Sequence, residues 1–151
     1  MPTLADLLRG MTPSIDDAKA PDNYYGYQVR KPYESESNYF RINPHVAGMA
    51  TEDNQITFNP FAPSLSDVSN RDAVGRNEAA RLWMREKGVA PNFPITPTQQ
   101  SFFSNTEYAK DPVALRQSVL GRILSGDPSA QDSTDQQKQM AYWLLQNLQK
   151  R

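Results

Sequence analysis

The stretch RDAVGRNEAARLWMREKG, residues 71–88, decides the fold of this chain. Its apolar residues recur at helical spacing and Gly88 closes the run, so we predict a helix from about Asp72 to Lys87. Glu78 stands three residues before Arg81, which is the spacing of a solvated ion pair on a helix surface. The residues expected to form the buried stripe are Val74, Ala79, Leu82 and Trp83, with Met84 at its edge.

Two capped helices are predicted further along the chain. Thr96 and Gln99 have the spacing of a capping box over a short helix that ends at residues 102–103. Asp111 is placed to cap the next helix, which is predicted to run through Ser125. The apolar residues expected to be buried in this second helix are Val113, Val119, Leu120, Ile123 and Leu124.

A last helix is predicted to begin near Ser133 or Thr134 and to continue to the end of the chain. Lys150 and Arg151 lie at its carboxyl end, where the helix dipole favours positive charge. The expected apolar face consists of Met140, Trp143, Leu144 and Leu148.

A minor β element is predicted before the long helix. In residues 37–43, SNYFRIN, Tyr39 and Phe40 point to opposite sides of a plausible strand. In residues 55–59, QITFN, Ile56 and Phe58 share one face. We expect these two pieces to pair as a two-stranded ribbon that leans on a helix.

The amino-terminal part has a different character. Residues 20–40, APDNYYGYQVRKPYESESNYF, hold five of the seven tyrosines. Residues 12–38 show neither a strand nor a helix period, so we predict an extended arm there. A short helix with a leucine face is expected before it, within residues 3–11. The predicted division is therefore 1–38 for the helix and arm, and 39–151 for the helical domain.

Burying the tyrosines of the arm offsets the entropy cost of ordering it, but only against a surface that already exists. A partner subunit repeated by symmetry is a good source of such a surface. The residues predicted to anchor a partner are Leu4, Leu7, Leu8, Tyr24, Tyr25, Tyr27 and Tyr33.

The composition limits the chemistry that the chain can support. It contains no cysteine, which excludes disulfides, thiolate nucleophiles and cysteine-based zinc sites. His45 is the single histidine and lies in a loop without a nucleophile motif. Glu52 and Asp53 are typical of the polar tip of a turn rather than of a paired-carboxylate site. We therefore predict no enzyme, no cofactor, no metal site and no membrane span.

Nucleic-acid binding is an alternative with some support in the sequence. Tyrosines surround Arg30 and Lys31, and the arginines of residues 71–87 could form a basic helix face. Against this, 16 basic residues face 17 acidic ones, so there is no bulk attraction to nucleic acid. Acidic residues also bracket the tyrosines themselves. The charge balance argues against a nucleic-acid platform and leaves this function as the second reading.

These predictions combine into a mainly α protein. We expect a small body of three to four helices with a minor two-stranded β element and a long extended amino-terminal arm.

Residues 54–93, NQITFNPFAPSLSDVSNRDAVGRNEAARLWMREKGVAPNF, resemble small accessory structural proteins of tailed bacteriophages, most closely those of short-tailed phages. The resemblance implies a non-enzymatic virion or assembly component, assembled in the host bacterial cytoplasm. It implies several copies bound to a portal, tail or capsid, as in a head–tail connector. The alternatives are a small phage-encoded nucleic-acid-binding or host-takeover factor and, behind it, a small hydrolase.

Overall fold

The computed structural model describes residues 22–62, 65, 68–126, 130 and 132–151. Over these residues the protein is mainly helical, as predicted, with a small sheet. The elements in chain order are β1 (Asn23–Tyr24), β2 (Tyr27–Arg30), α2 (Glu34–Ile42), β3 (Gly48–Ala50), β4 (Ile56–Phe58), α3 (Val68–Lys87), α4 (Pro97–Phe102), the 3₁₀ helix η2 (Glu107–Lys110), α5 (Pro112–Leu124) and α6 (Asp135–Gln149).

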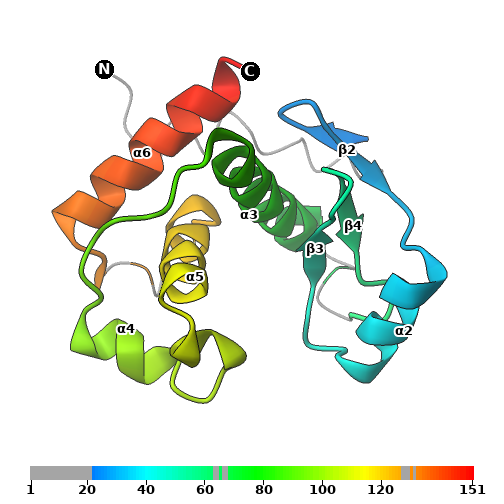
Figure 1. Ribbon diagram of the computed structural model, residues 1–151, viewed down its shortest axis with the longest axis horizontal. Coiled ribbons are helices and arrows are strands. Elements are labelled where there is room, and N and C mark those ends of the chain that lie inside the picture. Colours follow the sequence, from blue (N-terminus) through cyan, green and yellow to red (C-terminus); the bar gives the residue numbers. More distant parts are fainter. Residues whose placement is uncertain (1–21, 63–64, 66–67, 127–129, 131) are drawn as a thin grey trace.

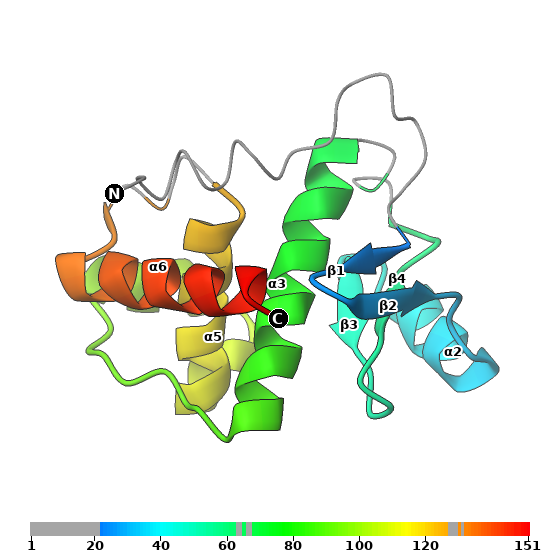
Figure 2. The same ribbon diagram turned by 90° about the horizontal axis from the view of Figure 1, so that it is seen from above.

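Helix α3 lies at the centre of the molecule. It contacts α5 and α6 on one side and strands β1, β3 and β4 on the other (Figure 1). The view from above shows the same division, with α5 and α6 on one side of α3 and the sheet and α2 on the other (Figure 2). None of the described helices is long and apolar enough to cross a membrane.

The central helix agrees with its prediction, apart from beginning one turn earlier, at Val68. Gly88 ends it with a left-handed φ of +65°, a conformation that favours glycine. The stripe is wider than expected because the helix has packed layers on two sides: Ala80 and Met84 are buried together with the predicted residues, and Val74 is only half-buried. The expectation of a solvated Glu78 is wrong, since this side chain is buried.

The predicted helix caps after α3 are confirmed. Thr96 forms the capping box of α4, Asp111 accepts hydrogen bonds from the first backbone amides of α5, and Thr134 forms the capping box of α6. Two predicted core residues are instead exposed. Val113 is 47% exposed in the first turn of α5, and Trp143 is 42% exposed and packs edge-on against Trp83.

The β element differs from its prediction. Residues 34–42 form helix α2 instead of a strand, because Glu36 closes a capping box onto the Tyr33 amide and adds negative charge to the first turn. Strand β4 is confirmed, but its antiparallel partner is β3. The sheet has four strands in the order β1-β2-β4-β3, and β2 runs parallel to β4.

The extended arm is wrong for residues 22–38. Strands β1 and β2 form an antiparallel hairpin, and Tyr24 and Tyr27 enter the hydrophobic core of their own chain. Gly75 of α3 makes room for this contact, since a Cβ there would collide with the Tyr24 ring. The surface that the rings need is therefore the chain's own α3. The rest of the predicted arm and the helix within residues 3–11, with Leu4, Leu7 and Leu8, lie outside the described residues.

The carboxyl-terminal residue fastens this hairpin. The Arg151 guanidinium lies 3.6 Å from the centre of the Tyr27 ring, and its Nη1 donates to the Tyr25 carbonyl at 3.0 Å. The Tyr27 hydroxyl donates to Glu86 of α3 at 2.6 Å. Burial and this hydrogen bond raise the pKa of Tyr27 to about 12. The two ends of the described chain are thus joined at one end of α3.

Candidate functional site

A groove runs along one side of α3, between β3 and the segment formed by η2 and α5. It consists of three adjoining hollows of about 420, 430 and 470 Å³. Arg81 and Tyr108 line all three hollows, so we treat them as one site, the α3 groove. Its floor is formed by α3, with Val74, Asn77, Glu78 and Arg81.

Two glycines bring the walls of the groove close to α3. A Cβ on Gly48 would lie 2.6 Å from Cγ1 of Val74, so only glycine lets β3 lie so close to the helix. A Cβ on Gly121 would collide with the side-chain amide of Asn77, so glycine also sets the approach of α5. The groove is therefore defined by close backbone packing on both of its sides.

Glu78 is the buried acidic group of the groove. Its side chain is 4% exposed and accepts a hydrogen bond from the Ala50 amide of β3. Burial raises the pKa of this carboxyl, while the positive charge of Arg81 and the Ala50 amide oppose the shift. No local signal in the sequence marks this position, because the burial of Glu78 depends on β3, which is distant along the chain.

Strand β3 presents one backbone edge to the groove. Thr51 donates its amide to Gln55 and Asn59 donates to Ala47, so the odd-numbered residues 47, 49 and 51 face β4. The backbone groups of Gly48 and Ala50 consequently point to the opposite edge. The hydrogen bond from the Ala50 amide to Glu78 agrees with this alternation. Among the described strands, β3 lies at the end of the sheet.

Arginines make the groove basic. The Arg81 guanidinium lies 5.9 Å from the centre of the Tyr108 ring, and its buried Nε has no hydrogen-bond partner among the described residues. Arg85 donates to the Thr51 carbonyl and, at 2.9 Å, to the Asn54 side chain. Arg85 and Arg122 line two different hollows of the groove.

The spacing of Asn77, Glu78 and Arg81 on α3 is that of the H-E-x-x-H motif of zinc peptidases. Both histidine positions differ, however, and a guanidinium stays protonated and cannot bind a metal. Within the described part of the chain, no group of three or more histidine, cysteine, aspartate or glutamate residues could hold a metal ion. These residues therefore do not supply zinc chemistry.

The two residues considered for catalysis in the sequence, His45 and Glu52, lie in different parts of the structure. His45 is exposed and lines the end of the groove, whereas Glu52 is exposed in the turn of residues 51–54. In the same turn, hydrogen bonds from Thr51 and Arg30 lower the pKa of Asp53 to about 2. The predicted turn is thus confirmed, and Asp53 is held by Thr51 and Arg30 of the same chain.

The predicted partner-binding tyrosines are divided between core and surface. Tyr24 and Tyr27 are buried, and Tyr25 is half-buried against the core. Tyr33 is 57% exposed, with the Arg30 guanidinium 3.7 Å from its ring centre. Of the described four, Tyr33 is the one with the most exposed side chain.

Exposed apolar side chains of α2, together with Phe61 of the segment after β4, lie beside the groove; we call them the α2 surface. Ile42 is 79% exposed, Phe61 is 42% exposed beneath the Arg41 guanidinium, and Tyr39 is 40% exposed. Tyr39 also lines the groove, which connects this α2 surface to it. Phe40 is the one residue that α2 buries, so most of this helix faces outwards.

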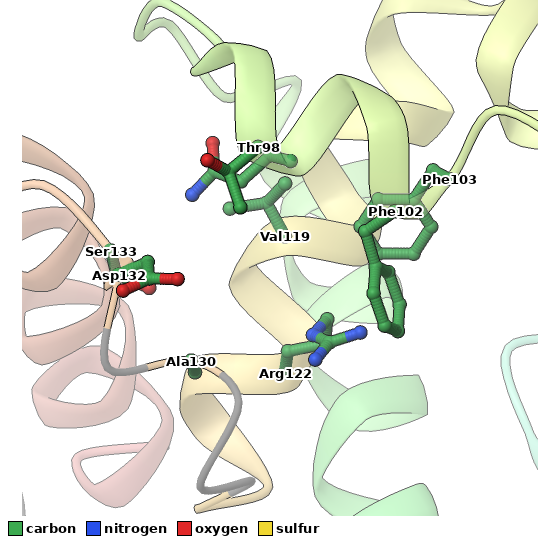
Figure 3. Close-up of a pocket in the computed structure, with 9 residues that line it drawn as sticks. Thr98, Phe102, Phe103, Val119, Arg122, Ala130, Asp132 and Ser133 are labelled. Atoms are coloured by element: carbon green, nitrogen blue, oxygen red, sulfur yellow. The ribbon is translucent and has the colours of Figure 1, made fainter.

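A separate hollow of about 190 Å³ lies between α4, α5 and the residues Ala130, Asp132 and Ser133 (Figure 3). Its lining is mostly apolar, and the Arg122 guanidinium covers the Phe102 ring at 3.5 Å from the ring centre. Figure 3 shows Asp132 and Ser133 on the side opposite the two phenylalanines. The volume is below the range of small-molecule sites and suits a single side chain.

The comparisons with known proteins identify no relative. No family model matches this chain, and no curated protein and no solved structure matches it significantly.

Proposed function

We propose that the protein is a non-enzymatic bacteriophage virion or assembly component that binds a larger portal, tail or capsid assembly. The observation that carries this proposal is the exposed α2 surface, Tyr39, Arg41, Ile42 and Phe61, beside the α3 groove. We propose this surface as the contact in place of the predicted tyrosine arm, because Tyr24 and Tyr27 lie in the chain's own core.

The α2 surface has the composition of a protein-binding site. It combines an exposed aliphatic side chain, two aromatic rings and an arginine, and aromatic residues and arginine are enriched in interfaces. Exposed apolar clusters beside a groove mark interaction sites more often than isolated exposed residues do. A portal, tail or capsid offers the same surface many times by symmetry, so several copies of this small protein would bind.

The test is quantitative mass spectrometry of gradient-purified particles from bacteria infected with the phage that encodes this chain. We expect the wild-type protein in a fixed ratio to the portal. Ile42→Asp should lower that ratio at least tenfold, because a charge would be buried without a partner in the interface. Gln139→Asp, on the exposed side of α6, is the matched control and should leave the ratio unchanged. A protein absent from the particles and from assembly intermediates would contradict the proposal.

A nucleic-acid-binding or host-takeover factor is the second candidate. The basic groove, with Tyr108 and Tyr39 in its lining, favours it. Filter binding of single- and double-stranded DNA over a range of salt concentrations distinguishes it from the first. A steep loss of affinity with salt would favour this candidate, and an absence of binding at low salt would exclude it.

A small hydrolase is the third candidate, and Glu78 is the observation in its favour. A buried carboxyl with a raised pKa beside a cleft is a typical general acid or base. Peptidoglycan and casein hydrolysis by the purified protein are the relevant assays. Activity that is lost in Glu78→Gln would favour a hydrolase over a binding protein.

A further inference from the structure

We infer that the α3 groove takes an extended acidic peptide segment of the partner assembly, which adds as a strand to the outer edge of β3 and places a carboxylate on Arg81. This inference rests on the proposed function, since it names the part of the partner that the groove holds.

The geometry of β3 carries the first step. Its outer edge faces the groove with the backbone groups of Gly48 and Ala50, while residues 47, 49 and 51 pair with β4. An edge strand of this kind binds an extended peptide through main-chain hydrogen bonds. With three residues and a rise of about 3.3 Å per residue, β3 matches a paired segment of about three residues.

The polar groups beside the edge carry the second step. The Ala50 amide is already occupied by Glu78, so the groups of β3 that keep no partner among the described residues are the Gly48 amide and carbonyl and the Ala50 carbonyl. Next to them stands Arg81, which lines all three hollows and whose guanidinium lies 5.9 Å from the centre of the Tyr108 ring. A carboxylate on the peptide would accept hydrogen bonds from this guanidinium where it lines the groove, and a charge-assisted hydrogen bond of this type is among the strong ones.

The charge of the lining selects an acidic segment over a basic one. Arg81, Arg85 and Arg122 line the groove, whereas its one buried acid, Glu78, already accepts the Ala50 amide. Complementary charge across an interface speeds association and excludes partners of the same sign. Tyr39 and Tyr108 add aromatic contact area at the two walls.

The test uses the full-length protein and a fluorescein-labelled peptide of alternating valine and aspartate, nine residues long, in a fluorescence anisotropy titration. The same peptide with lysine in place of aspartate tests the charge. A third version, N-methylated at alternate residues, removes the backbone donors but keeps the side chains. We expect the aspartate peptide to bind, and the lysine and N-methylated peptides to bind at least about tenfold more weakly.

The variant Arg81→Gln should bind the aspartate peptide at least about tenfold more weakly, which corresponds to the loss of one charge-assisted hydrogen bond. Lys87→Gln removes the same charge from an exposed position of the same helix and should leave the affinity unchanged. Circular dichroism melts establish that both variants are folded, and the three peptides test the inference on the unaltered protein as well.

Each contrary outcome has a separate meaning. Equal binding of the aspartate and lysine peptides, or an unchanged affinity in Arg81→Gln, would overturn the inference. If single-stranded DNA displaces the labelled peptide at a lower concentration than the unlabelled aspartate peptide does, the groove binds nucleic acid instead. Tighter binding after deletion of residues 1–21 would show that the chain's own segment is the occupant. If the protein is present in particles but binds no peptide, the inference fails and the proposed function stands.

Discussion

Replacing Tyr24 or Tyr27 by alanine should destabilise the whole protein, because both rings lie in its core. Tyr24 is 8% exposed and donates to Asp72 at 2.8 Å, and Tyr27 is 3% exposed. Removal of a buried aromatic side chain costs about 3–5 kcal/mol. In Tyr24→Ala the loss includes the hydrogen bond to Asp72, whose side chain is 1% exposed and would keep no other hydrogen-bond donor among the described residues.

The matched control for these variants is Tyr33→Ala. Tyr33 belongs to the same tyrosine-rich stretch but is 57% exposed, and its contacts with Arg30 and Asp53 are worth about 1 kcal/mol or less. For a chain of this size about 3–5 kcal/mol lowers the melting temperature by roughly 6–20 °C. Differential scanning calorimetry measures the shift directly. If Tyr24→Ala and Tyr27→Ala melt within about 2 °C of the wild type, the hairpin does not belong to the core.

Three further predictions concern α3 and the helix caps. Burial raises the pKa of Glu78, so the protonated side chain contributes its full stability below the unfolded-state pKa, and this contribution is lost as the pH rises through the folded-state pKa. Glu78→Gln should therefore become more stable relative to the wild type as the pH rises. Urea unfolding between pH 4 and 9 measures this difference. Gly75→Ala should lower the urea midpoint, since the new Cβ meets the Tyr24 ring. At Gly88 nothing lies within 4 Å of a new Cβ, so the change in the urea midpoint of Gly88→Ala should come only from the strain of its positive φ. Thr134→Ala should cost about 1 kcal/mol through the lost cap of α6, and an unchanged urea midpoint would contradict the role of its side chain.

Local rules predicted the helices because their signals lie within a few residues. The caps at Thr96, Asp111 and Thr134 and the stop at Gly88 each depend on neighbours along the chain. Residues 37–43 were wrongly predicted as a strand because their short apolar pattern suits either structure. The capping box that Glu36 closes onto the Tyr33 amide favours the helix, and Arg30 of the preceding strand supports it by binding Glu36 at 2.7 Å and 2.9 Å.

The tyrosine-rich stretch shows what the sequence left open. The balance of entropy and burial predicted that the rings need a surface to pack on, but nothing in the sequence indicates that they pack on Gly75 and its neighbours on α3. The α3 groove was missed for a similar reason. Glu78 was paired with Arg81 on one helix face, and its burial depends on β3, which reaches it from about thirty residues earlier in the chain.

Photo-crosslinking in assembled particles tests the central claim most directly. A benzophenone amino acid at Tyr39, beside the groove, and a second at Lys138, on the exposed side of α6, would be incorporated separately into the protein. Mass spectrometry of purified, irradiated particles would then identify the attached protein. We predict that position 39 crosslinks to a portal, tail or capsid subunit through an extended acidic segment and that position 138 does not. Crosslinks to such a subunit from position 138 alone would contradict the account.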